Sequence, residues 1–201
     1  RFEETDTRKI YHYNDTITFE SDFSSDNWLD QDTKNVVNTG TELFDFDGRR
    51  DGTNDGSSVA LGFTTSGDYV FRYIINFTTY TAGNGAIITV GLGSVPSSTI
   101  HTGTADYLGV RHQLEPTNKW LTQHVADGAN MTTQDGHDTL STYSTGTDYY
   151  VEQVFDTTAN TFVVTYRTTS HTGTTVQTRS ATATGTYSMA YVRVDNAVDN
   201  A

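Results

Sequence analysis

Hydrophobic and polar side chains alternate along most of the chain, and this pattern predicts β-strands from end to end. The strongest run is Asp68–Phe77, which is largely apolar on both faces and therefore favours a central strand. Turns rich in Gly, Thr, Ser and Asn separate the runs, and no helical periodicity of useful length appears. Further strands are predicted at residues 17–23, 35–38, 43–46, 58–61, 86–93, 106–113, 119–126, 149–155, 161–167, 174–182 and 189–195.

These strands predict an all-β fold, an antiparallel two-sheet sandwich with about a dozen strands. A length of 201 residues fits one such domain, placed at residues 17–201. Residues 1–16 are polar and charged and are predicted to form an N-terminal arm or lead-in, which lies on a neighbouring subunit or frays.

Two of the predicted strands, 43–46 and 58–61, flank a stretch rich in Gly, Asp and Asn. Such residues tolerate the positive φ angles of tight turns, so the pattern predicts a hairpin. The stretch also offers carboxylate and amide oxygens, the ligands that Ca²⁺ prefers, from Asp45, Asp47, Asp51, Asn54 and Asp55. Their spacing does not match an EF-hand loop. The alternative is a solvated acidic turn whose charge is offset by Arg49 and Arg50.

The formal net charge of −13 disfavours binding to nucleic acid, because phosphate backbones are bound by Lys and Arg. The chain has no Cys, which excludes thiolate metal sites and Cys catalysis. No apolar run is long enough for a spanning helix, so membrane insertion is not expected.

The segments DFSSDNWLDQDTK, FDFDGRRDGTNDGSSVALG, YVFRYIINFTT, YLGVRH and TFVVTYRTTS resemble those of concanavalin A-like (laminin-G-like, legume-lectin-like) jelly-roll domains. More narrowly, the chain resembles an uncharacterised environmental and viral group of such domains, associated with virions or tails. The resemblance implies an extracellular or virion-surface location. It also implies a second calcium hypothesis, in which Asp22 on an early strand and Asp195 near the last strand hold a structural ion.

Hydrolases on this fold place two Glu and one Asp on a single strand, and this chain contains no such motif. Glu152 and Asp156 share one face of a predicted strand. Because Asp156 is expected to begin a turn, however, the two carboxylates would be about 13 Å apart by strand rise. No catalytic residues are therefore predicted.

A glycan site needs an aromatic platform beside polar side chains. Tyr107 and Arg111 share one face of a predicted strand, and the next predicted strand carries Trp120 and His124, with Arg72 expected alongside. The alternative is that Tyr107 and Trp120 belong to the core. His112 and His124 lack a third zinc ligand in register and are interpreted as ordinary strand residues.

The leading hypothesis is a non-enzymatic structural or adhesion module of a homo-oligomer or larger assembly, which binds a glycan or cell-surface receptor. The alternatives are a free carbohydrate-binding module or lectin, and a glycoside hydrolase.

Overall fold

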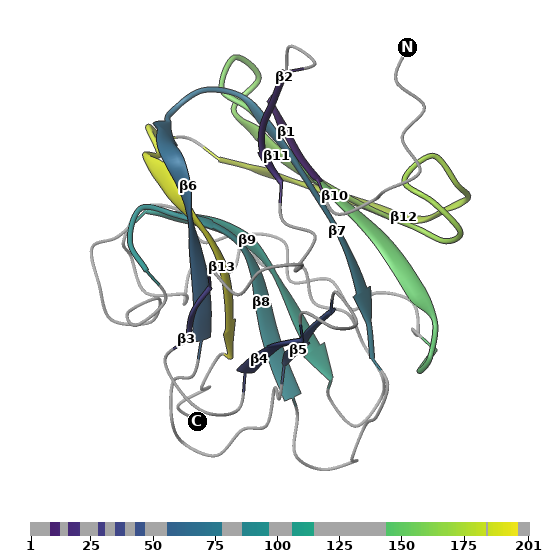
Figure 1. The fold of residues 1–201 in the computed structure, drawn as a ribbon. Coiled ribbons are helices and arrows are strands. Elements are labelled where there is room, and N and C mark those ends of the chain that lie inside the picture. Colours follow the sequence, from purple (N-terminus) through teal and green to yellow (C-terminus); the bar gives the residue numbers. More distant parts are fainter. Residues whose placement is uncertain are drawn as a thin grey trace, which may run out of the picture.

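The computed structural model describes residues 9–12, 16–20, 28–30, 35–38, 43–46, 56–77, 86–96, 106–114, 144–183 and 185–196. Every regular element within these ranges is a β-strand, and all of the strand pairs are antiparallel (Figure 1). The same ranges contain no helix long and apolar enough to cross a membrane.

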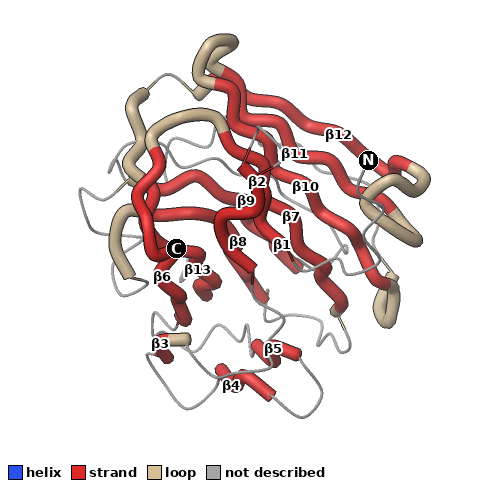
Figure 2. Tube along the Cα trace, turned by 45° about the horizontal axis from the view of Figure 1, so that its top comes forward, coloured by secondary structure: helices blue, strands red, loops and turns tan. Residues whose placement is uncertain are grey.

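The larger sheet has six strands in the order β12-β11-β10-β7-β1-β2 (Figure 2). Their bounds are β1 Lys9–His12, β2 Thr16–Glu20, β7 Tyr69–Asn76, β10 Asp148–Asp156, β11 Thr161–Arg167 and β12 Thr175–Thr182. The central position predicted for the run at 68–77 is confirmed, because β7 lies between β10 and β1.

The second sheet has five strands in the order β3-β6-β13-β8-β9, and a separate pair consists of β4 and β5. Their bounds are β3 Leu29–Asp30, β4 Asn35–Asn38, β5 Leu43–Phe46, β6 Gly56–Thr65, β8 Ala86–Gly93, β9 Tyr107–Leu114 and β13 Met189–Asn196.

The hydrophobic core lies between the two large sheets, because every second side chain of each strand points inward. On β10 these are Tyr149, Val151, Gln153 and Phe155, all of them buried. The opposing sheet contributes residues such as Leu92, Leu108, Val110, Val192 and Val194. The predicted antiparallel two-sheet jelly-roll sandwich is thus confirmed.

The predicted hairpin between residues 43–46 and 58–61 is wrong. β5 pairs with β4, whereas β6 pairs with β3 and with the C-terminal strand β13. The alternating pattern located both strands, but it carries no information about a partner that is far away in the sequence.

Two other predictions concern the N-terminal arm and the strand at 119–126. Lys9–His12, within the predicted arm, forms β1 and pairs with β7 inside the sandwich. The strand predicted at 119–126, and with it the proposed hairpin to 106–113, lies outside the described residues.

A chain of hydrogen bonds connects the two sheets through the core. Gln153 Nε2 donates to the Val90 carbonyl oxygen at 2.9 Å and to Tyr73 Oη at 3.2 Å. Tyr73 Oη lies 3.0 Å from His112 Nε2. His112 is 1% exposed, and its burial lowers its pKa from 6.5 to about 3. The ring is therefore neutral near pH 7. Because Tyr73 Oη already accepts from Gln153, we assign the tautomer in which the Tyr73 hydroxyl donates its hydrogen bond to Nε2.

Candidate functional site

Half-exposed aromatic and charged side chains lie on the outer face of the six-stranded sheet. They alternate along their strands with the core residues described above. Tyr150 on β10 is directly opposite Ile74 of β7 and Arg167 of β11. One row further along, Glu152 is opposite Arg72 of β7 and Thr165 of β11. This surface is called the Tyr150 face and comprises Arg72, Ile74, Asn76, Asp148, Tyr150, Glu152 and Arg167.

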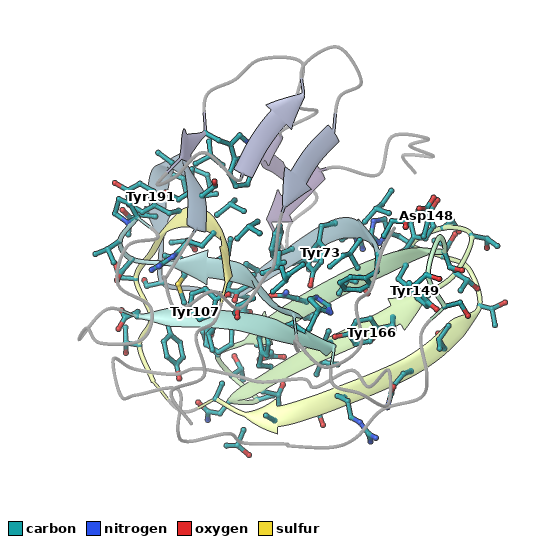
Figure 3. All side chains as sticks on the ribbon, turned by 90° about the horizontal axis from the view of Figure 1, so that it is seen from below. Tyr73, Tyr107, Asp148, Tyr149, Tyr166 and Tyr191 are labelled. Atoms are coloured by element: carbon teal, nitrogen blue, oxygen red, sulfur yellow. The ribbon has the colours of Figure 1, made fainter. Side chains whose placement is uncertain are left out.

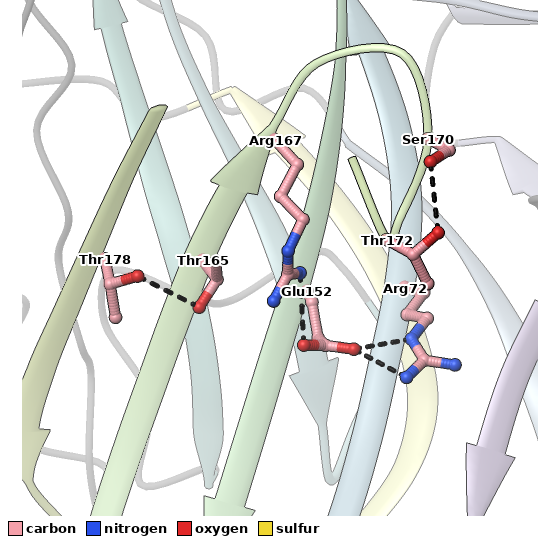
Figure 4. A network of polar contacts seen from close by, with 7 residues as sticks. All are labelled: Arg72, Glu152, Thr165, Arg167, Ser170, Thr172 and Thr178. Carbon is pink, nitrogen blue, oxygen red and sulfur yellow. Dashed lines mark hydrogen bonds and ion pairs between the residues drawn. The ribbon is translucent and has the colours of Figure 1, made fainter. Parts of the chain in front are cut away.

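Glu152 is held between two guanidinium groups at the centre of the Tyr150 face (Figure 4). Its Oε2 accepts from Arg72 Nε and lies against Nη2, both at 2.6 Å. Its Oε1 accepts from Arg167 Nη1 at 3.2 Å. The side chains of Arg72, Glu152 and Arg167 are 34%, 14% and 19% exposed. The three side chains are thus fixed in position by one another and are partly exposed.

The Tyr150 ring stands beside this ion-pair network. It meets the ring of His171 edge to face, with centroids 5.3 Å apart and planes at 88°. At the end of the same face, Asn76 Nδ2 donates to Asp148 Oδ1 at 2.7 Å. Both Asn76 and Asp148 are exposed.

This arrangement suits recognition of a sugar. The apolar CH face of a pyranose packs on an aromatic ring, and its hydroxyls hydrogen-bond to fixed polar groups. Glu152 and both arginines are already oriented by one another, so little side-chain entropy would be lost when a hydroxyl binds. The guanidinium groups of Arg72 and Arg167 are donors and the carboxylate of Glu152 is an acceptor, so the face carries both kinds of hydrogen-bonding group.

Glu152 and Asp156 lie in different surroundings on β10. Both oxygens of Glu152 accept from guanidinium groups, Oε2 from Arg72 and Oε1 from Arg167. Asp156 ends β10, and its Oδ1 accepts from the amide of Ala159 at 2.7 Å. The expectation that Asp156 begins a turn is confirmed.

The residues predicted to form one glycan site are divided between the two sheets. Arg72 lies on the six-stranded sheet, whereas Tyr107 and Arg111 lie on β9 of the five-stranded sheet. The predicted grouping of Arg72 beside Tyr107 is therefore wrong. In Figure 3, Tyr107 and Tyr191 occupy one side of the molecule, and Tyr73, Tyr149 and Tyr166 the other.

Tyr107 is on the outer face of its sheet, yet it is only 2% exposed. Its ring lies over a floor of small residues, because a Cβ at Gly109 would overlap the ring and one at Gly91 would be 2.8 Å from Tyr107 Oη. The guanidinium carbon of Arg193, a fully buried residue on β13, is 5.7 Å from the ring centroid. Tyr107 is thus a packing residue here, though not a member of the central core.

The other predicted site residues are only partly placed. Trp120 and His124 lie outside the described residues, and for Arg111 only the backbone on β9 is described. His112 points into the core beside Tyr73 and Tyr166. This position agrees with its interpretation as an ordinary strand residue. The roles of Arg111, Trp120 and His124 in binding stay predictions.

The calcium hypotheses also stay predictions. Asp22, Asp47, Asp51 and Asp55 lie outside the described residues. Asp195 is on β13, opposite Thr89 and Gly56, and its side chain is not described. Within the described ranges, no group of three His, Asp or Glu side chains is arranged to hold a metal ion.

Sequence reasoning missed Tyr150, Arg167 and Arg193. The alternation in YYVEQVF places Tyr150 and Glu152 on one face, and this signal was available. The alternation could not show that Arg72 and Arg167 flank that face, because they come from strands far apart in the sequence.

Two solved structures with TM-scores above 0.5 support the fold. The legume lectin-like domain from Entamoeba histolytica aligns over 96% of this chain and 89% of its own, with 8% identity and a TM-score of 0.53. A sialidase aligns over 96% of this chain with 13% identity and a TM-score of 0.52, but over only 15% of its own length. Peanut lectin, solved with a nonamer peptide, aligns over 72% of this chain and 73% of its own with 11% identity and a TM-score of 0.48. No protein-family model and no curated protein matches the sequence.

The chain therefore has the concanavalin A-like, lectin-like jelly-roll fold. At these identities the likeness shows the fold alone, because the fold hosts many unrelated functions.

Proposed function

We propose that this protein is a non-enzymatic adhesion module that binds carbohydrate through the Tyr150 face. The observation that carries the proposal is the half-buried Tyr150 on the outer face of β10, beside a carboxylate fixed between two arginines. The likeness of the fold to a legume lectin-like domain supports the proposal. An extracellular or virion-surface setting, within a homo-oligomer or larger assembly, belongs to the same proposal.

The ligand expected at this face is a neutral or weakly charged glycan. The two guanidinium charges share one carboxylate, and the exposed Asp148 adds a negative charge nearby. The described polar groups of the face are therefore close to electrically balanced. Sugar hydroxyls, which both donate and accept, match such a surface better than a strongly acidic ligand does.

The test is a glycan array followed by titration calorimetry with the best glycan found. Tyr150→Ala removes the stacking ring and is expected to weaken binding by about tenfold or more, since such aromatic contacts are worth roughly 1 kcal/mol or more beyond area burial. Tyr191→Ala is the matched control, because Tyr191 is a half-buried tyrosine on the outer face of the other sheet. It should leave binding unchanged.

Two outcomes would overturn the proposal. Binding that survives Tyr150→Ala but is lost in Tyr191→Ala would move the site to the face of Tyr107 and Arg111. Turnover of a β-glucan that is abolished by Glu152→Gln would show a hydrolase instead.

A further inference from the structure

The binding groups of the Tyr150 face form three successive rows along one strand. Asp148, Tyr150 and Glu152 are alternate residues of β10, so all three side chains lie on its outer face. Neighbouring rows are therefore about 7 Å apart, and the Cα atoms of the first and last rows are separated by about 13 Å. These three rows are called the β10 track.

Each row of the β10 track offers a different kind of contact. In the first row the exposed Asn76 and Asp148 are directly opposite each other and share a hydrogen bond of 2.7 Å. The middle row carries the aromatic ring of Tyr150. In the last row Glu152 is fixed between its two arginines. Hydrogen-bonding groups thus lie on both sides of the stacking ring.

The length of the β10 track exceeds that of a single sugar. A pyranose, built from single bonds of about 1.5 Å, advances a linear glycan by about 5 Å. A separation of about 13 Å between the end rows therefore matches two to three successive sugars better than one. Recognition of a single terminal sugar would instead gather the polar groups around one ring.

A loop borders the β10 track on the side of β11. The segment 168–174 connects β11 to β12, and the Thr168 amide closes it by donating to the Thr174 carbonyl oxygen at 3.1 Å. This loop brings His171 edge to face against the Tyr150 ring. A glycan that crossed the strands at Tyr150 would meet the loop. A glycan that follows β10 passes beside it.

The hydrogen-bonding groups end at the row that follows Glu152. Val154 of β10 is directly opposite Val70 of β7 and Val163 of β11, and all three are half-buried. Valine side chains cannot bond sugar hydroxyls, so a further sugar at this row would gain little. In the other direction, Asp148 is the first residue of β10. The β10 track therefore provides three subsites.

We propose that the β10 track binds an internal stretch of an extended, neutral, β-1,4-linked glycan, with one sugar over each row. The inference rests on the proposed function and specifies its ligand class. Tyr150 stacks on the middle sugar, and the first and last rows bond hydroxyls of its two neighbours. β-1,4-linked chains suit the straight track because they are extended, whereas β-1,3- and α-1,4-linked chains coil.

Titration calorimetry of the full chain with cello-oligosaccharides and β-1,4-linked manno-oligosaccharides, each of one to six sugars, tests the proposal. For the series that binds, affinity is expected to rise by about tenfold or more from one sugar to three, because each flanking row adds hydrogen bonds. It should then stay constant from three sugars to six.

The double variant Asn76→Ala/Asp148→Ala removes the first row. Both residues are exposed, so the fold should be retained. The affinity plateau is expected to move from three sugars to two, while the disaccharide affinity stays unchanged. Thr182→Ala is the matched control, since Thr182 is an exposed polar residue of β12, away from β10. Its plateau should remain at three sugars.

Several results would overturn this inference and leave the proposed function standing. They are a monosaccharide that binds as tightly as the trisaccharide, an affinity that keeps rising to six sugars, and a plateau that stays at three in the double variant. Failure of both series to bind, although the glycan array yields another ligand, has the same meaning. If no glycan binds at all, the proposed function falls, and this inference falls with it.

Discussion

Mild acid is expected to destabilise the sandwich through His112. The ring is buried between the sheets, where Tyr73 donates to it and the rings of Phe77 and Tyr166 lie about it. Protonation would place a positive charge in this apolar layer and convert Nε2 from an acceptor into a donor. The hydrogen bond from Tyr73 would then have to be reversed or broken.

The magnitude follows from the two pKa values of His112. Burial lowers the pKa to about 3 in the folded chain, from an ordinary value of 6.5. Between these values the unfolded chain binds more protons, so stability present above pH 6.5 is lost as the pH falls toward 3. At pH 5 the loss is about 2 kcal/mol relative to neutral pH, because one pKa unit corresponds to about 1.4 kcal/mol.

Urea denaturation, followed by tryptophan fluorescence, provides the assay. Trp28 is in the core and should report the transition. The comparison is between wild type and His112→Gln at pH 7 and pH 5, since Gln accepts from Tyr73 but does not titrate. The variant should lose about 2 kcal/mol less stability on acidification than the wild type. An equal loss in both proteins would refute the reasoning, because acid effects at other groups cancel in this difference.

Two further predictions concern packing and metal binding. Gly109→Ala would force its Cβ against the Tyr107 ring and should lower the free energy of unfolding by about 1 to 3 kcal/mol in urea. Gly67→Ala, where a Cβ meets no atom within 4 Å, should have little effect, and equal losses would contradict the packing argument. If calcium is bound, EDTA should lower the melting temperature of the wild type, and Asp22→Asn or Asp195→Asn should remove this response. An unchanged melting temperature with EDTA would end the calcium hypothesis.

Strand positions could be predicted from the sequence, because a strand that buries one face alternates apolar and polar residues along the chain. The runs at 35–38, 43–46, 86–93 and 161–167 match the bounds of β4, β5, β8 and β11. Together with the absence of a helical period, they were sufficient to predict a two-sheet antiparallel sandwich.

The candidate site could be predicted only in part. The alternation along β10 places Tyr150 and Glu152 on one face. Arg72 was singled out as a binding residue, but it was grouped with Tyr107 on what is in fact the other sheet. Local sequence could not correct this grouping, because residues 72 and 152 are eighty positions apart and meet only through strand pairing.

The residue pattern thus specifies which segments are strands and which face of each strand is apolar. Strand neighbours are visible only in the folded chain, where β5 pairs with β4 and β6 pairs with β13. The difference arises because alternation reflects burial of a strand's own side chains. Register and partner choice depend instead on packing and hydrogen bonds between distant segments. The same pairing brings Arg72 and Arg167 to either side of Glu152, and it leaves β12 at the edge of the sheet.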